Sequence, residues 1–219
     1  MPVQPARPDR REHRMTADLF VPDPATELTA RRELARVPIT PPPGPFGRVL
    51  GWVGRRMAGR GMAGGMDNAF ALAHQRQVLV AVALFERRVA RWRALDGHLM
   101  LLATLAAARE VGCGWCIDYG FREADRAGLD LAKAQEIGRW RDSPVFSSVE
   151  RRVVGYAVAM TATPPTVDDA MVAALRADLG DAALVELTMM VAVENQRSRF
   201  NAALGLVAQG FSASCRLPG

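Results

Sequence analysis

The chain of 219 residues, 49% of them hydrophobic, is long enough for one domain with a sizeable core and an extension. Its net charge of +5 comes from residues 1–60, which contain eleven arginines and six acidic residues, so the rest of the chain has no net charge. A nucleic-acid partner requires a concentrated basic surface, and the main part of the chain has no excess positive charge to form one.

Residues 1–45 are predicted to be a flexible segment rich in proline and arginine. Within it, residues 1–22 resemble a tail, and Asp23 is expected to cap a short helix that ends near Arg36. The proline run at 38–45 favours extended backbone, because proline lacks an N–H donor and restrains the residue before it. This run is therefore a connector.

Residues 46–66 are predicted to form an amphipathic, glycine-rich helix. Its apolar side chains recur at helical spacing on one face: Phe46, Val49, Leu50, Val53 and Met57. We expect this face to pack on the body of the protein or on a partner subunit rather than on an anionic membrane.

Residues 67–219 are predicted to be an all-α domain, because no β-alternation persists and caps recur along the chain. Asp67, Asp130, Thr166 and Asp181 are the expected cap residues, and Ser147 with Glu150 forms a capping box. The expected helices span 67–93, 97–111, the cysteines to Gly128, 130–140, 147–161, 166–179 and 181–208.

The compartment is predicted to be the cytoplasm. The first residues lack the apolar core of a signal peptide, and no apolar run is long enough to cross a bilayer. Three cysteines are too few for a secreted disulfide framework. No membrane partner is expected.

The most informative motif is Gly-Cys-Gly-Trp-Cys at 112–116. Gly112 suits the left-handed position that closes one helix, which places Cys113 and Cys116 in the first turn of the next. Their i, i+3 spacing puts both sulfurs on one face, and the helix dipole lowers a thiol pKa there. A redox dithiol is favoured over two alternatives, inert packing and a metal site. A zinc site needs two further ligands, and the remaining candidates show no ligand-like spacing: His13, His74, His98 and Cys215.

With the Gly-Leu-Asp turn at 128–130 and the polar segment 194–205, this motif resembles the alkylhydroperoxidase D-like branch of the carboxymuconolactone decarboxylase family over roughly residues 70–215. The resemblance implies an all-α, oligomeric helical bundle that reduces small hydroperoxides without a cofactor. It further implies that Cys116 attacks the peroxide, that Cys113 resolves the oxidised sulfur, and that an external thiol of unknown identity supplies electrons.

Two residues of the family's proton relay are missing. A histidine is expected four residues after the second cysteine, where Gly120 stands, and a glutamate twelve residues before the first, where Leu101 stands. We therefore predict weak or atypical peroxidase activity. Glu110 and Asp118 are candidate acid–base residues, although Glu110 fits a solvated helix end and Asp118 fits a charge that complements the helix dipole. Tyr119, Asn195 and Arg199 are candidate substrate-binding residues.

The polar residues of the last predicted helix leave their placement open. Glu194, Arg197, Ser198 and Asn201 share one face, and Asn195 with Arg199 share a neighbouring one. Lining a cavity above the dithiol, contacting another subunit and facing solvent are all compatible with this pattern. The function is open in the same way, the alternatives being a non-redox enzyme of the same fold acting on a small carboxylated substrate and a non-catalytic protein that senses redox state or binds a ligand.

Overall fold

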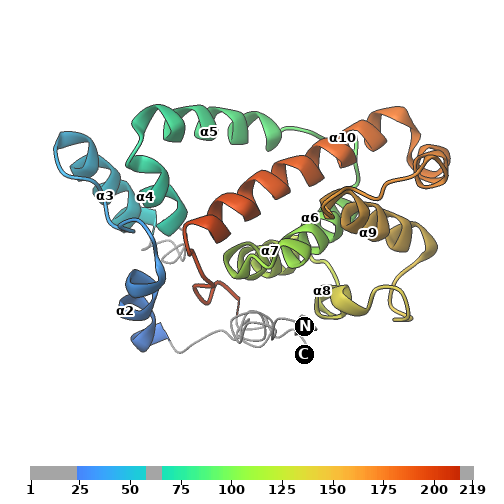
Figure 1. Cartoon of the computed structure of the whole chain (residues 1–219), viewed down its shortest axis with the longest axis horizontal. Coiled ribbons are helices and arrows are strands. Elements are labelled where there is room, and N and C mark those ends of the chain that lie inside the picture. Colours follow the sequence, from blue (N-terminus) through green and yellow to red (C-terminus); the bar gives the residue numbers. More distant parts are fainter. Residues whose placement is uncertain (1–23, 58–65, 213–219) are drawn as a thin grey trace, which may run out of the picture.

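A computed structural model describes residues 24–57 and 66–212. The described residues form helices and no strand, which confirms the all-α prediction. Helix α6 (Gly97–Val111) lies at the centre and packs against α7 (Gly114–Arg126), α9 (Ser148–Thr161) and α10 (Asp169–Ala203), the last crossing the molecule diagonally (Figure 1). The core between them is apolar and fully buried, with Leu102, Leu105, Phe121, Val153, Val154, Leu187 and Val191 at its centre. None of the described helices has the length and apolar character of a membrane span.

The helices that precede this bundle lie at its left and along its top in Figure 1. They are α2 (Pro24–Leu34), α3 (Pro45–Met57), α4 (Asp67–Ala73) and α5 (Arg76–Val89). The predicted tail at 1–22, the Asp23 cap and the glycines that follow Met57 fall outside the described residues.

The segment between α2 and α3 is fastened to the end of α10. The backbone N–H of Arg36 donates to the carbonyl of Leu204 at 2.9 Å, and its Nη1 donates to the carbonyl of Ala203 at 2.7 Å. Ile39, only 4% exposed, packs in a small cluster with Leu206. The extended proline-rich connector is therefore docked on the bundle.

The apolar face predicted for 46–57 is only partly covered. In α3 the fully buried residues are Gly47, Gly51 and Gly54, whereas Val49 of the predicted face is 62% exposed. Because glycine has no side chain, the backbone of α3 can pack closely against other segments of the same chain at these positions.

The helix predicted over 67–93 is two helices, and Asp67 is not a cap. Gln75, whose backbone is extended, separates α4 from α5 and accepts from the Gln77 N–H at 3.3 Å. Asp67 lies inside the first turn of α4, where it is buried 3.5 Å from Arg31 Nε. Burial raises the pKa of Asp67 to about 6 against the lowering effect of Arg31 and Arg32.

The caps further along the chain are mostly as predicted. Ser147 and Glu150 form the complete capping box of α9. Asp130 caps α8 (Leu131–Gln135), which tightens into the 3₁₀ helix η2 (Glu136–Arg139).

The start and end of α10 differ from the prediction. Asp168 caps the helix by accepting from the Met171 N–H at 2.8 Å, in place of Thr166. The predicted break is present at Gly180, with φ of 77°. Asp181 pairs with Arg176, and the helix ends at Ala203 rather than near 208.

Candidate active site

The two cysteines lie where the local sequence predicts. Gly112 adopts φ of 77° and closes α6, and Cys113 becomes the N-cap of α7, its sulfur accepting from the Cys116 N–H at 3.2 Å. The Cα atoms are 5.3 Å apart and the sulfurs form a disulfide. Both therefore sit in the first turn of a helix, where unpaired amides and the helix dipole favour a thiolate.

A cavity of about 850 Å³ opens beside this turn, between α5, α6, α7 and α10. Cys116 lines the cavity and Cys113 does not; Cys113 is 1% exposed and Cys116 is 7% exposed. Most of the wall is apolar, including Val82, Met100, Leu101, Trp115 and Phe200. A small organic molecule would therefore meet the sulfur of Cys116 first.

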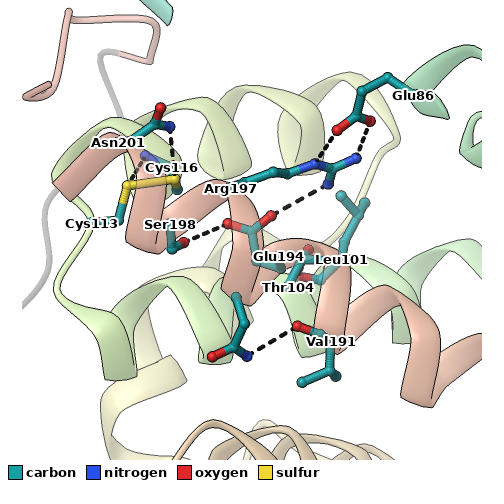
Figure 2. A network of polar contacts seen from close by, with 11 residues as sticks. Glu86, Leu101, Thr104, Cys113, Cys116, Val191, Glu194, Arg197, Ser198 and Asn201 are labelled. Atoms are coloured by element: carbon teal, nitrogen blue, oxygen red, sulfur yellow. Dashed lines mark hydrogen bonds and ion pairs between the residues drawn. A yellow bond between two sulfur atoms is a disulfide. The ribbon is translucent and has the colours of Figure 1, made fainter. Parts of the chain in front are cut away.

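One polar face of α10 approaches the disulfide from the side of the cavity (Figure 2). The amide Nδ2 of Asn201 donates to the sulfur of Cys116 at 3.3 Å, and Asn201 is fully buried. Asn68 of α4 fixes this amide by donating to its Oδ1 at 2.5 Å. A donor aimed at a sulfur stabilises a thiolate more than a thiol, so Asn201 favours the reactive form of Cys116.

Glu194 lies two turns earlier on the same face. Its side chain is nearly buried, with the residue 6% exposed, and its Oε1 accepts from Ser198 Oγ at 2.8 Å. Its Oε2 lies 3.4 Å from Nη1 of Arg197, whose guanidinium also holds both carboxylate oxygens of Glu86 on α5. Burial raises the pKa of Glu194, opposed by Arg197 and by the hydrogen bond from Ser198. The sequence left open whether this polar face lines a cavity, contacts another subunit or faces solvent. Glu194, Arg197 and Asn201 line the cavity.

The two positions that lack relay residues line the same cavity. Leu101 lies beside Glu194 (Figure 2), and Gly120 is on the facing helix α7. A Cβ added to Gly120 would lie 2.6 Å from Cδ2 of Leu105, which is 1% exposed, so a histidine at this position requires the Leu105 side chain to shift.

Besides Cys113, four of the predicted site residues do not line the cavity, namely Glu110, Asp118, Asn195 and Arg199. Glu110 is exposed at the end of α6 and does not line it. Asn195 donates to Thr161 Oγ1 at 2.8 Å, and Arg199 donates to the Thr161 carbonyl at 3.3 Å. Asn195 and Arg199, predicted to bind substrate, thus join α10 to the end of α9 and do not line the cavity.

Asp118 has a role that neither of its two interpretations anticipated. It is fully buried and accepts three backbone N–H groups of the C-terminal segment, from Gln209 at 2.7 Å, Phe211 at 3.0 Å and Ser212 at 3.2 Å. With all these bonds made, the carboxylate holds the segment that follows α10 rather than serving as a base for the thiol.

Tyr119 does line the cavity, as a substrate-binding residue should. Its ring stacks on Trp115 at 5.3 Å, and Phe211 packs edge-on against both rings. Burial raises the pKa of Tyr119, so the phenol stays neutral and able to donate.

The metal alternative finds no support among the described residues, which contain no group of three His, Cys, Asp or Glu side chains placed to hold an ion. His74 contacts the Pro38 carbonyl at 2.8 Å and His98 the Ala127 carbonyl at 3.1 Å. Cys215 and His13 lie outside the described part of the chain.

Sequence reasoning missed Asn68 and Glu86, because each is a polar residue in a helical segment without a motif around it. For Asn201 a signal existed, namely its i+7 spacing from Glu194.

Known proteins resemble the chain in sequence and in structure. A model of the carboxymuconolactone decarboxylase family matches residues 77–159. The uncharacterized protein YnjA of Escherichia coli is 36% identical over 143 residues, which cover 64% of this chain and 76% of that protein.

Among solved structures, one of unknown function from Agrobacterium tumefaciens, described as a candidate antioxidant defence protein AhpD, is 26% identical with a TM-score of 0.57, covering 60% of this chain and 90% of its own. Two further structures share the fold. An uncharacterized peroxidase-related protein from Silicibacter sp. TM1040 is 15% identical with a TM-score of 0.66, covering 84% of this chain and 100% of its own. The debrominase Bmp8 is 19% identical with a TM-score of 0.65, covering 81% of this chain and 94% of its own.

Proposed function

This chain belongs to the carboxymuconolactone decarboxylase family, and we propose that it acts there as a dithiol oxidoreductase that reduces small organic hydroperoxides with electrons from an external thiol. The main support is the position of the Cys116 sulfur. Of the two bonded sulfurs, it is the one that faces an apolar cavity and accepts a hydrogen bond from the buried amide of Asn201. We assign the resolving role to Cys113, which is buried at the N-cap and does not line the cavity.

The chemistry follows from these two positions. The thiolate of Cys116 attacks the outer oxygen of the hydroperoxide, an S–O bond forms as the O–O bond breaks, and an alcohol leaves after taking up a proton. The sulfur is oxidised by two electrons to a sulfenic acid. The thiol of Cys113 then displaces water to give the Cys113–Cys116 disulfide, and two equivalents of an external thiol restore the dithiol.

The apolar wall of the cavity sets the expected substrate size. Side chains such as Val82, Met100 and Phe200 bury apolar surface of a ligand at about 25 cal/mol per Å². A hydroperoxide with a hydrocarbon group therefore gains binding energy that hydrogen peroxide does not.

Reduced protein should lose its two active-site thiols to one equivalent of cumene hydroperoxide, faster than to one equivalent of hydrogen peroxide. The measurement is the titration of remaining thiols with a chromogenic aryl disulfide (DTNB) after timed quenching. The two alternatives, a non-redox enzyme and a sensing or binding protein, predict different results. Thiols that react with DTNB but not with either peroxide would rule out the peroxidase and favour the non-redox enzyme. If the two thiols are oxidised once but peroxide is not consumed repeatedly when dithiothreitol is supplied, a redox sensor is favoured.

We further propose that the protein is a homo-oligomer. Large apolar side chains are exposed on α5 and on the neighbouring part of α10: Val78 (43%), Val80 (46%), Leu84 (58%), Val185 (68%) and Met189 (43%). Large apolar side chains exposed in this way are typical of a protein–protein interface, and a second copy of the chain offers the same surface.

Light scattering after gel filtration should give a mass of at least two subunits, and Leu84→Glu should shift the mass towards one subunit. Leu34→Glu is the matched control, because Leu34 is 56% exposed on α2, away from this surface, and should leave the mass unchanged. A single-subunit mass for the unaltered protein at micromolar concentration would contradict the proposal.

A further inference from the structure

Peroxide reduction at Cys116 requires a proton to move. The thiol must lose its proton to become the nucleophile, and the leaving alkoxide must gain one, because an unprotonated alkoxide is a poor leaving group. The residues that move this proton in the relatives are absent here, since position 101 is leucine and position 120 is glycine. Some other group near the cavity has to do so.

The polar face of α10 runs from the attacking sulfur to a buried carboxyl group. Asn201 contacts Cys116, Ser198 lies one turn before it, and Glu194 one turn before that, with Ser198 Oγ hydrogen-bonded to Glu194 Oε1 (Figure 2). In the same view Ser198 lies between the disulfide and Glu194. Glu194 lines the cavity that Cys116 faces, beside Leu101.

We infer that Glu194 is the acid–base residue of this site, and that it accepts the proton of the Cys116 thiol and delivers it to the leaving oxygen of the hydroperoxide. The inference rests on the proposed peroxidase function. In the balanced step, the sulfur–oxygen bond forms, the oxygen–oxygen bond breaks, and the proton lost by sulfur ends on the alcohol. Glu194 is unchanged at the end.

The surroundings of Glu194 suit this role. Its burial favours the neutral form, while Arg197 and the hydrogen bond from Ser198 favour the charged form. The second oxygen is held by Arg197, which is itself fixed by Glu86 of α5. A carboxyl group restrained in this way keeps its orientation while it exchanges a proton.

The other ionisable groups of the cavity fit less well. Both oxygens of Glu86 are engaged by Arg197. Oε1 of Glu123 lies 3.6 Å from Nη1 of the exposed Arg126. Tyr119 is the remaining candidate, since burial raises the pKa of its phenol and keeps it protonated. A phenol with a raised pKa donates a proton but is a poor acceptor for the proton of a thiol.

The experiment compares Glu194→Gln with two classes of oxidant. Oxidation of the reduced dithiol by cumene hydroperoxide, whose leaving group needs a proton, should slow by about 10²–10⁴-fold. Oxidation by peracetic acid and exchange with DTNB, whose leaving groups need none, should change by less than about threefold at a pH high enough that Cys116 is already a thiolate. Glu186→Gln is the matched control, because Glu186 is a buried glutamate on the same helix that accepts the Ala94 N–H at 2.7 Å and does not line the cavity.

Further variants keep the test decisive. Ser198→Ala should slow oxidation by cumene hydroperoxide about tenfold and leave the other two reactions nearly unchanged. This variant replaces Glu194→Gln in the test if Glu194→Gln does not fold. Equal slowing of all three oxidants, or a loss that appears in Tyr119→Phe and not in Glu194→Gln, would overturn the assignment of Glu194. Failure of the unaltered protein to react with cumene hydroperoxide, with normal DTNB exchange, would overturn the peroxidase function itself.

Discussion

Cys116→Ser should reduce hydroperoxide consumption to the uncatalysed background, while Cys113→Ser should retain one turnover. A serine hydroxyl is not ionised near neutral pH and does not attack an O–O bond, so the first step is lost with the Cys116 sulfur. In Cys113→Ser the amide of Asn201 and the cavity are intact, so Cys116 is still oxidised, but no thiol remains to displace water. One equivalent of peroxide should disappear, and Cys116 should gain one oxygen, seen by mass spectrometry of the intact protein.

Cys215→Ser is the matched control for this pair. It removes the third cysteine of the chain and should leave both the rate and the stoichiometry unchanged. The opposite pattern, with one turnover in Cys116→Ser and none in Cys113→Ser, would exchange the roles of the two cysteines. Full turnover in both would place the reaction elsewhere.

The features that could be predicted from the sequence are those set by neighbours in the chain. Gly112 closes α6 because its left-handed conformation follows from residues within one turn. The dithiol at the start of α7 and the capping box of α9 are local in the same sense. Each prediction needed only the spacing of residue types along a few positions.

The contacts that complete the site join distant parts of the chain. Asn68 reaches Asn201 across 133 positions, and Glu86 reaches Arg197 across 111. Nothing in the sequence around either residue indicates its partner, because the contact depends on how α4 and α5 lie against α10.

The polar segment of α10 shows a second limit. Its spacing predicts two neighbouring polar faces, one with Glu194 and Asn201 and one with Asn195 and Arg199, but not which of them turns towards the dithiol. That choice depends on the packing of α10 against α6 and α9. The result is that the predicted Asn195 and Arg199 bind the end of α9, and Glu194 takes the place beside the cavity.

Loss of the Asp118 carboxylate should weaken the fold. Its buried carboxylate is the acceptor for three N–H groups of the C-terminal segment, on Gln209, Phe211 and Ser212. Hydrogen bonds to a charged group contribute roughly 1.5–3 kcal/mol each. Through Phe211 the same segment covers the rings of Trp115 and Tyr119, two residues of the cavity wall.

We therefore expect Asp118→Ala to lower the free energy of unfolding by about 3–5 kcal/mol, because it removes the acceptor from three buried donors at once. The free energy of unfolding of Asp118→Asn should lie between those of this variant and the unaltered protein. The amide oxygen of asparagine still accepts a hydrogen bond, whereas its NH₂ group faces other donors. Urea unfolding followed by circular dichroism measures the difference. Asp125→Ala, an exposed aspartate on the same helix, should change stability by less than about 0.5 kcal/mol. Equal stability of Asp118→Ala and Asp125→Ala would show that the C-terminal segment is held by other contacts.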